Sequence, residues 1–203
     1  MNKIVIDVAK KKVENFVGRL EVKGDLELIC EGSNKIEIEF RKDVCLKIVL
    51  LDDSFVDLSI VDSSDFIKRD VMILQYNRSE MVYQEKFASN GPKDLLINNI
   101  INGNGNKSKI EIKCIAYQDV VNMKVMVKAL KNTVDNLLVE DVKGILQGGS
   151  IIVKPEMEID TNEVVANHFV TLGAIDEEVL IYLESKGLNR KQATELILEG
   201  FLK

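Results

Sequence analysis

Apolar and polar residues alternate along most of this chain, from about residue 3 to residue 171. The alternating apolar positions include Leu26 and Leu28; Ile36, Ile38 and Phe40; Leu46 and Ile48; Val56, Leu58 and Ile60; Ile110 and Ile112; Val125 and Val127; Leu137 and Val139; and Ile151 and Val153. A period of two with many Val and Ile residues is typical of β-strands. Polar clusters rich in Gly, Asn, Asp and Ser separate these segments and favour turns. The pattern therefore predicts many short strands.

The alternation alone leaves three architectures open, because a sandwich, a barrel and a β-helix all consist of many short strands. The segment NGNGN at residues 102–106 has the composition of a tight hairpin turn, which would suit a sandwich or a barrel. Most other connections look looser, and no strict repeat is visible. The run DVVNMKVMVKALKNTV at residues 119–134 fits either period in part, and its Val content favours a strand.

The pattern changes after Gly173, where the apolar spacing becomes helical. Asp176 is an expected N-cap, and Gly187 is an expected C′ residue of the first helix. Asn189 is expected to cap a second helix, with Gln192 as its capping-box partner, and Gly200 is expected to end that helix. Two helices this short must pack on another surface to be stable.

Composition narrows the class of protein. The chain has 203 residues, of which 46% are apolar and 30% are charged, so it reads as a folded globular protein. Its net charge of −6 argues against nucleic acid as the main partner. Apolar runs stay shorter than the roughly 18 residues of a membrane span, and the first residues do not resemble a secretion signal. We therefore expect neither nucleic acid nor a membrane as a partner, and a cytoplasmic location.

The three cysteines, Cys30, Cys45 and Cys114, are expected to be free thiols. Their spacing does not form the close pairs that a zinc site of the common type needs. Cys30 and Cys45 are interpreted as small core residues, and so is Cys114 on first reading.

The C-terminal quarter carries a specific resemblance in several blocks. These are KPEMEI at residues 154–159, VVANHFVTLG at 164–173, LIYLESKGL at 180–188 and GF at 200–201. In order, spacing and residue type they resemble the C-terminal signature of the SufB/SufD scaffold proteins of the SUF iron–sulfur cluster assembly system. The chain looks like a short, divergent, SufD-like member.

That resemblance implies the fold and the function. It implies a right-handed parallel β-helix over residues 1–173 and a small helical hairpin over residues 174–203. It further implies a scaffold, not an enzyme, that carries a transient iron–sulfur cluster. The implied partners are an ABC-type ATPase of the SufC kind and a second scaffold subunit, in a homodimer or a heterodimer. The chain itself has no G-x-x-x-x-G-K-[ST] motif for ATP.

The resemblance also indicates candidate residues. His168, the single histidine, aligns with a proposed cluster ligand of the SufD branch, while Phe169 replaces the Glu of the SufB branch. Cys114 is the best thiol candidate for a second ligand. The alternative for His168 is a structural histidine on an apolar strand face. In the hairpin, Ile181, Tyr182 and Phe201 are the expected ATPase contacts, whereas Leu180, Leu183 and Leu196 are expected to face inward.

Two rival functions stay open. The first is a degenerate family member that acts only as an interaction subunit, which the missing Glu and the uncertain cysteine ligand favour. The second is a β-helix enzyme acting on carbohydrate, which would need grouped carboxylates and aromatic platforms for sugars. The chain has no Trp and only 5% aromatic residues, which argues against the second.

Overall fold

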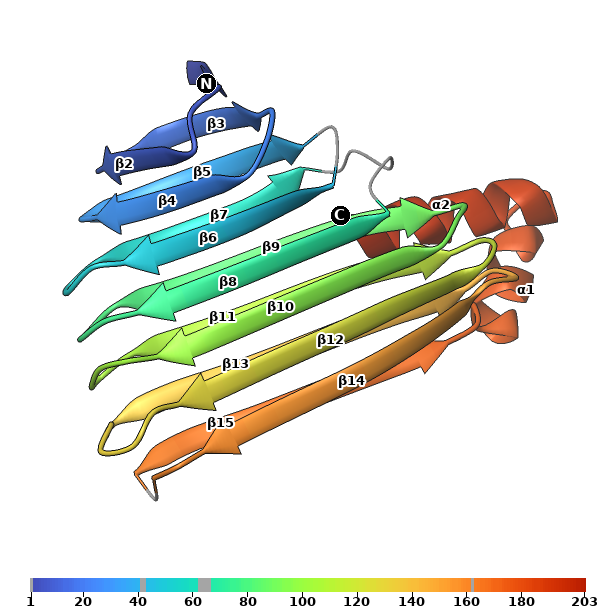
Figure 1. Cartoon of the computed structure of the whole chain (residues 1–203). Coiled ribbons are helices and arrows are strands. Elements are labelled where there is room, and N and C mark those ends of the chain that lie inside the picture. The colour runs from blue at the N-terminus through green and yellow to red at the C-terminus, as the bar shows by residue number, and fades with distance from the viewer. Residues whose placement is uncertain (1, 41–42, 62–66, 162) are drawn as a thin grey trace.

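A computed structural model describes residues 2–40, 43–61, 67–161 and 163–203 of the chain. Fifteen strands in these ranges precede two helices (Figure 1). The strands are β1 Asn2–Ile6, β2 Lys10–Glu14, β3 Val17–Val22, β4 Leu26–Glu31, β5 Ser33–Phe40, β6 Val44–Leu50, β7 Phe55–Val61, β8 Lys68–Gln75, β9 Glu80–Ser89, β10 Lys93–Ile101, β11 Lys107–Ala116, β12 Val120–Ala129, β13 Asn136–Leu146, β14 Ser150–Ile159 and β15 Val164–Gly173; the helices are α1 Glu177–Ser185 and α2 Arg190–Leu202. The ambiguous run around residue 120 is a strand, β12, as predicted.

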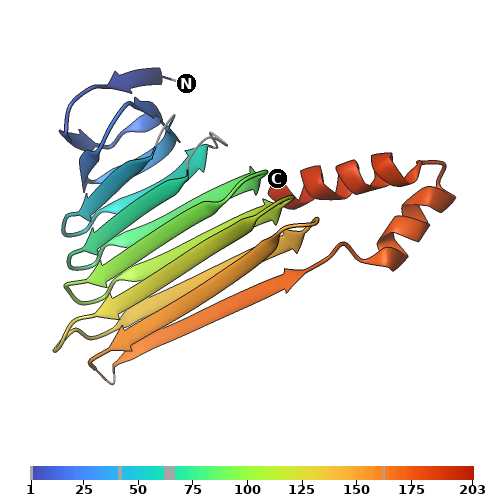
Figure 2. The same ribbon diagram turned by 45° about the vertical axis from the view of Figure 1, so that its right-hand side comes forward.

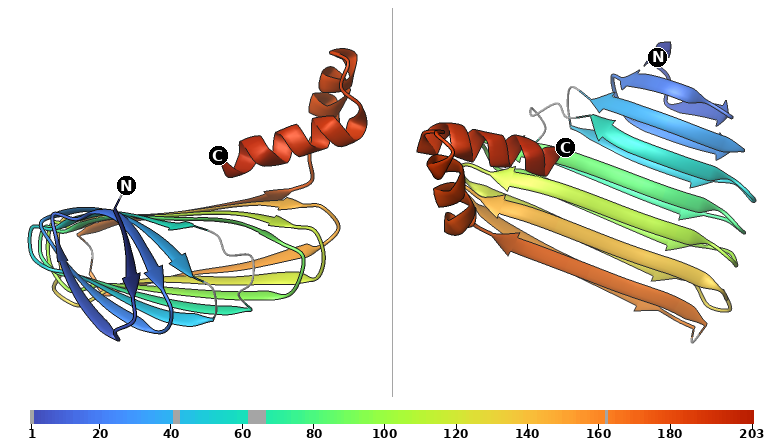
Figure 3. Two further views of the ribbon diagram at one scale, coloured as in Figure 1. Left: turned by 90° about the horizontal axis from the view of Figure 1, so that it is seen from above. Right: turned by 180° about the vertical axis from the view of Figure 1, so that it is seen from behind.

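The strands form a coil with two flat faces. Odd-numbered strands make an eight-stranded sheet in the order β1-β3-β5-β7-β9-β11-β13-β15, and even-numbered strands make a seven-stranded sheet from β2 to β14. Each described strand pairs in parallel with the strand two places away in the chain, as between β9 and β11. The two sheets lie face to face when viewed from above (Figure 3). The expected parallel β-helix with C-terminal helices is confirmed.

The alternation of the sequence builds the interior. In β9 the buried residues are Met81, Tyr83, Glu85, Phe87 and Ser89, and the residues between them are partly exposed. Because pairing is parallel and in register, inward side chains of successive coils stack in columns, and most of these columns are apolar. The alternating phase therefore sets which side chains enter the lumen between the sheets.

The coil widens along the chain. Register partners are 16 residues apart at Asn2 and Gly18, 25 apart at Phe55 and Glu80, and 30 apart at Lys107 and Leu137. The strands lengthen accordingly, and Figure 1 shows the short coils near the N-terminus and the long ones near β15. The lumen is therefore broadest toward the C-terminal end.

One row of corners is stabilised by stacked polar side chains. The Ser79 amide donates to Asn106 Oδ1 over 3.0 Å, and the Asn106 amide donates to Asn136 Oδ1 over 2.8 Å. Gly105, just before Asn106, has a φ of +67°, which glycine adopts without strain. The segment NGNGN is therefore a corner between β10 and β11, which lie in different sheets, and the hairpin interpretation was wrong.

A charged cluster lies inside the lumen. Arg69 and Glu85 are each about 1% exposed and form an ion pair, and Tyr83 Oη donates to Glu85 Oε2 over 2.5 Å. The Arg69 guanidinium also lies 5.0 Å from the centre of the Phe40 ring. Breaking a buried pair of this kind costs more than the pair itself contributes, because the remaining charge is left uncompensated.

The predicted helix caps are present. The Asp176 carboxylate accepts from the Glu178 amide over 2.8 Å, and Asn189 and Gln192 form both hydrogen bonds of a capping box. Gly187 has a φ of +96°, as expected for a C′ residue. Gly200 does not end the second helix, because α2 continues to Leu202 with no left-handed backbone at Gly200.

The hairpin stands beside the carboxyl ends of the later odd-numbered strands (Figure 1). Figure 2 shows α1 beyond the end of β15 and α2 folded back toward the eight-stranded sheet. Leu180 and Leu198 are buried, whereas Leu196 is 51% exposed, so the expected inward position of Leu196 was wrong. Within the described ranges, neither helix is long and apolar enough to cross a membrane.

We expect Gly144→Ala to destabilise the fold. An added Cβ would lie 2.5 Å from Ile151 Cδ1 and 2.8 Å from Leu172 Cδ2, so two side chains would have to shift. The expected loss is about 1–3 kcal/mol in free energy of unfolding, measured by urea titration. Gly173→Ala is the control, because nothing lies within 4 Å of an added Cβ there. Equal losses in both variants would contradict the packing argument.

Candidate functional site

The last coil leaves one end of the lumen open. β15 is the edge strand of the eight-stranded sheet, and β14 is the edge strand of the seven-stranded sheet. Inward side chains of earlier coils are covered by the next coil, whereas those of β14 and β15 are only partly covered. We call this surface, formed by the inward side chains of β14 and β15, the open end. An unpaired sheet edge of this kind is a template for pairing with another chain.

His168 lies at the open end. Val164 and Ala166, four and two residues before it in the same phase, pack against the hydrophobic core, so this phase of β15 faces the lumen. His168 itself is exposed because the described structure has no further coil over it. Phe169 has the opposite phase, so it lies on the outer face of the sheet, 55% exposed.

Glu140 is the partner of His168 in the strand register. It is 1% exposed, and within the described part of the chain neither of its carboxylate oxygens has a hydrogen-bond partner. Burial raises the pKa of this carboxyl to about 8, because the charged form loses its hydration. A buried carboxyl without partners at an exposed rim is unusual in a folded protein, and it needs an explanation.

Sequence reasoning missed Glu140, although a signal was present. Leu138 and Val142 flank it at spacing two, so the alternation already placed a charged residue in the inward phase of a strand. Together His168 and Glu140 bring an imidazole and a carboxyl to one place on the rim of the lumen.

The structure does not bring Cys114 together with His168. Cys114 is register partner to Gly144, which lies four residues beyond Glu140 along β13 and pairs with Leu172, not with His168. With strand and residue spacings of about 4.8 and 3.3 Å, the two backbone positions are about 16 Å apart. Cys114 is fully buried, and burial raises the pKa of its thiol to about 12.

The other cysteines are also remote from the open end. Cys30 is a buried core residue, as expected. Cys45 is exposed, so its interpretation as a core residue was wrong: Val44 and Leu46 take the inward phase of β6. Within the described ranges, no three His, Cys, Asp or Glu side chains gather where they could hold a metal ion together.

The helical hairpin presents an apolar surface on α1. Ile181 and Tyr182 are 57% and 60% exposed, and Val179 next to them is also exposed. Phe201, on α2, is half-buried, with its ring centre 5.5 Å from Lys113 Nζ on β11. Of the three predicted contact residues, two therefore face solvent and the third lies against the sheet.

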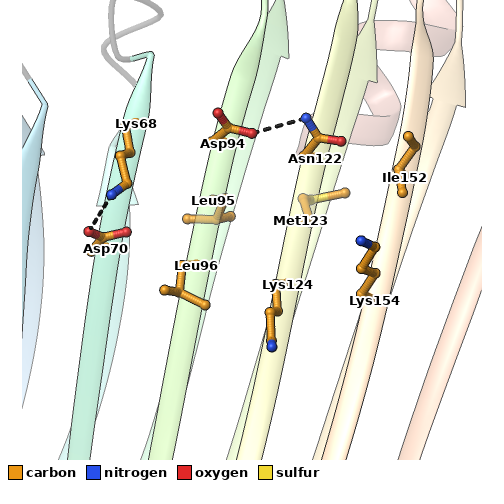
Figure 4. Close-up of a pocket in the computed structure, with 10 residues that line it drawn as sticks. All are labelled: Lys68, Asp70, Asp94, Leu95, Leu96, Asn122, Met123, Lys124, Ile152 and Lys154. Carbon is orange, nitrogen blue, oxygen red and sulfur yellow. Dashed lines mark hydrogen bonds and ion pairs between the residues drawn. The ribbon is translucent and has the colours of Figure 1, made fainter.

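A shallow groove of about 360 Å³ lies on the outer face of the seven-stranded sheet (Figure 4). Lys68 Nζ lies 3.2 Å from an oxygen of Asp70, and Asn122 donates to Asp94 over 3.0 Å. The first pair lies within β8 and the second joins β10 to β12. The groove faces away from the lumen, so it is separate from the pair of Glu140 and His168.

The comparisons with known proteins cover the same part of the chain. The family model of the SUF system FeS cluster assembly, SufBD core domain, matches residues 94–201. This range begins in β10 and ends in α2, so it includes the open end and the hairpin.

Curated relatives match over shorter segments. The iron–sulfur cluster assembly protein SufD of Escherichia coli K12 is 40% identical over 48 residues, which is 24% of this chain and 11% of that protein. An iron–sulfur cluster assembly SufBD family protein of Mycobacterium leprae is 44% identical over 48 residues, 23% of this chain and 12% of the relative. A SufBD family protein of Methanothermobacter thermautotrophicus is 33% identical over 72 residues, 32% of this chain and 18% of the relative. Each alignment thus covers a minor part of its relative.

The buried carboxyl predicts a pH dependence of stability. The unfolded chain releases the Glu140 proton near the ordinary pKa of 4.5, whereas the folded chain holds it up to about pH 8. Stability therefore falls as pH rises from 4.5 to 8 and then levels off. Glu140→Gln removes this dependence. The two pKa values set an upper limit of about 5 kcal/mol on the stability that the wild type loses over that range and the variant keeps, measured by urea titration at each pH.

Asp141→Asn is the matched control for Glu140→Gln. Asp141 is the next residue on β13, faces outward and accepts from Lys143 Nζ over 2.7 Å. We expect its pH profile between 5 and 8 to follow the wild type. A Glu140→Gln profile parallel to that of the wild type would show that Glu140 is ionised in the folded protein.

Proposed function

The chain belongs to the SufBD family of the SUF iron–sulfur cluster assembly system, and on that basis we propose that it is a non-catalytic scaffold for cluster assembly. The observation that carries this proposal is the family match over residues 94–201, more than half of the chain. That segment includes the open end, with its free sheet edges, and the exposed apolar face of α1.

We propose that the cluster, as cargo, contacts the open end through His168. A neutral imidazole and a carboxylate are both suitable ligands for iron, and a histidine can replace a thiolate in an iron–sulfur cluster. Glu140 lies beside His168 in the register and would supply the second donor once its proton is lost. Cys114, also predicted as a ligand, lies beneath the surface and would take part only after the last coil moves.

Two donors are fewer than the four protein ligands that usually hold a cluster. We propose that a second scaffold chain, identical or related, supplies the others. The open end supports this proposal, because the free edges of β14 and β15 and the partly covered Val153 and Met157 offer both backbone and apolar surface to a second chain.

We propose that an ABC-type ATPase of the SufC kind binds the hairpin. Ile181 and Tyr182 support this proposal, because adjacent exposed apolar and aromatic side chains on a short helix are typical of an interaction site. Phe201 remains a predicted contact, although its ring already packs on the sheet.

One observation favours a second candidate function. Burial keeps Glu140 mostly protonated at neutral pH, and a protonated carboxyl does not bind a metal ion. A subunit that only joins a scaffold to its ATPase, without holding a cluster, would need neither donor. Cluster reconstitution separates this candidate from the first.

His168→Ala should lower the yield of bound cluster. The measurement is anaerobic reconstitution with iron and sulfide, read by visible absorbance and by bound iron and sulfide per chain. We expect a decrease of at least about tenfold, because even the loss of an outer partner of a ligand costs that much in metal affinity. Circular dichroism should be unchanged, since His168 is exposed.

Asn167→Ala is the matched control, because Asn167 is the preceding exposed residue of β15 and has the opposite phase. It should bind as much cluster as the wild type. A wild-type chain that binds no cluster, alone or with a second scaffold subunit, would support the interaction subunit and contradict the scaffold proposal.

Ile181→Ser together with Tyr182→Ser should weaken binding of the ATPase. Central apolar and aromatic anchors carry most of the free energy of an interface, so we expect the Kd to rise about tenfold or more, measured by calorimetry with the SufC-type ATPase of the same organism. Val17→Ser is the control, since Val17 is equally exposed, at 60%, but lies on β3 near the narrow end. Unchanged affinity in the double variant would place the ATPase elsewhere.

A further inference from the structure

Three lysines form a ladder on the outer face of the eight-stranded sheet. Lys86 on β9, Lys113 on β11 and Lys143 on β13 are successive register partners, so their side chains stand side by side. Stacked like charges repel one another unless each has a partner. Two of these lysines pair with main-chain oxygens at the end of α2, and the third pairs with a carboxylate of its own strand.

Two of the lysines bind the end of α2. Lys86 Nζ donates to the main-chain oxygen of Lys203, one residue beyond α2, over 2.6 Å, and Lys113 Nζ donates to the Phe201 carbonyl oxygen over 2.8 Å. The last carbonyls of a helix lack intrahelical partners and carry the negative end of its dipole. The ladder thus places cations at the position where a helix C-terminus is best stabilised. Lys143 Nζ donates instead to Asp141 of its own strand.

The remaining attachment of the hairpin is small. α1 packs on α2, and α2 packs on β11. The apolar residues buried here are Ala193 and Leu198 of α2, Leu180 of α1, and Ile115, which has the outward phase of β11 and is nevertheless fully buried. Residues 174–176, which join β15 to α1, have no regular structure.

We infer that the hairpin is a latch with two states, held closed by Lys86 and Lys113. In the docked state the main-chain oxygens of Phe201 and Lys203 accept from Lys113 and Lys86, and α2 packs on β11. In the released state α2 leaves the ladder while the coil stays folded. Elements with few buried apolar contacts and exposed polar ones are those that open locally at low free energy.

The latch determines where α1 presents its exposed face. While α2 is docked, α1, the helix that carries the exposed Ile181 and Tyr182, lies beyond the end of β15 (Figure 2). Release through residues 174–176 would let that face move. The inference concerns the attachment of the hairpin, and it stands whether or not the proposed ATPase binds there.

Hydrogen exchange of the full chain tests the latch. Lys86→Met together with Lys113→Met should raise the exchange rates of α2 amides about tenfold, since released helices of this length are unstable in water. Amides of β9 and β11 and the thermal midpoint should stay unchanged. Lys143→Met, from the same ladder, is the matched control, because Lys143 Nζ donates to Asp141 of its own strand, and it should exchange like the wild type.

Ionic strength gives a second readout. Salt screens exposed charge–dipole contacts, so added KCl should speed exchange of α2 in the wild type and have little effect in the double variant. Unchanged protection of α2 in the double variant would overturn the latch. So would equal loss of protection in β11, which would show that hairpin and coil open together, or an equal effect of Lys143→Met.

Discussion

The parallel backbone ladder between strands two places apart in the chain is the constraint on which the rest of this structure depends. It places the inward residues of one coil directly over those of the next, so a column such as Tyr83, Ile110 and Glu140 is fixed by register alone. A slip of one residue would exchange the inward and outward faces of a strand. The stacked corner of Ser79, Asn106 and Asn136 opposes such a slip, because each amide needs the side chain of the next coil.

The same ladder explains the candidate site. Glu140 and His168 occupy successive positions of one column, yet Glu140 is buried and His168 is exposed, because only Glu140 has a further described coil over it. The chemical contrast between the two residues thus comes from their place in the stack. A second chain that extended the column would bury the imidazole as β15 buries the carboxyl.

Short-range features were predictable from the sequence, and long-range ones were not. The caps at Asp176 and Asn189 depend on residues two or three positions away, and both are present. Alternation predicted the strands but not which strand pairs with which. Only the family resemblance distinguished the β-helix from a sandwich or a barrel. The error at Leu196 has the same origin, because the face that α2 turns to the sheet depends on β11, far away in the sequence.

Because the coil widens along the chain, the two ends of the lumen differ in cross-section. A second copy stacked head to tail would place its narrow first coil on the broad last coil of the first copy. Register partners are 16 residues apart in the first coil and 28 apart in the last, at Asn136 and Val164. Much of the broad end of the lumen would then stay uncovered. The broad ends of two copies match in cross-section, and an isologous contact between them gives a closed dimer. The difference between the two ends therefore disfavours head-to-tail assembly into fibres, to which proteins with unpaired edge strands are prone.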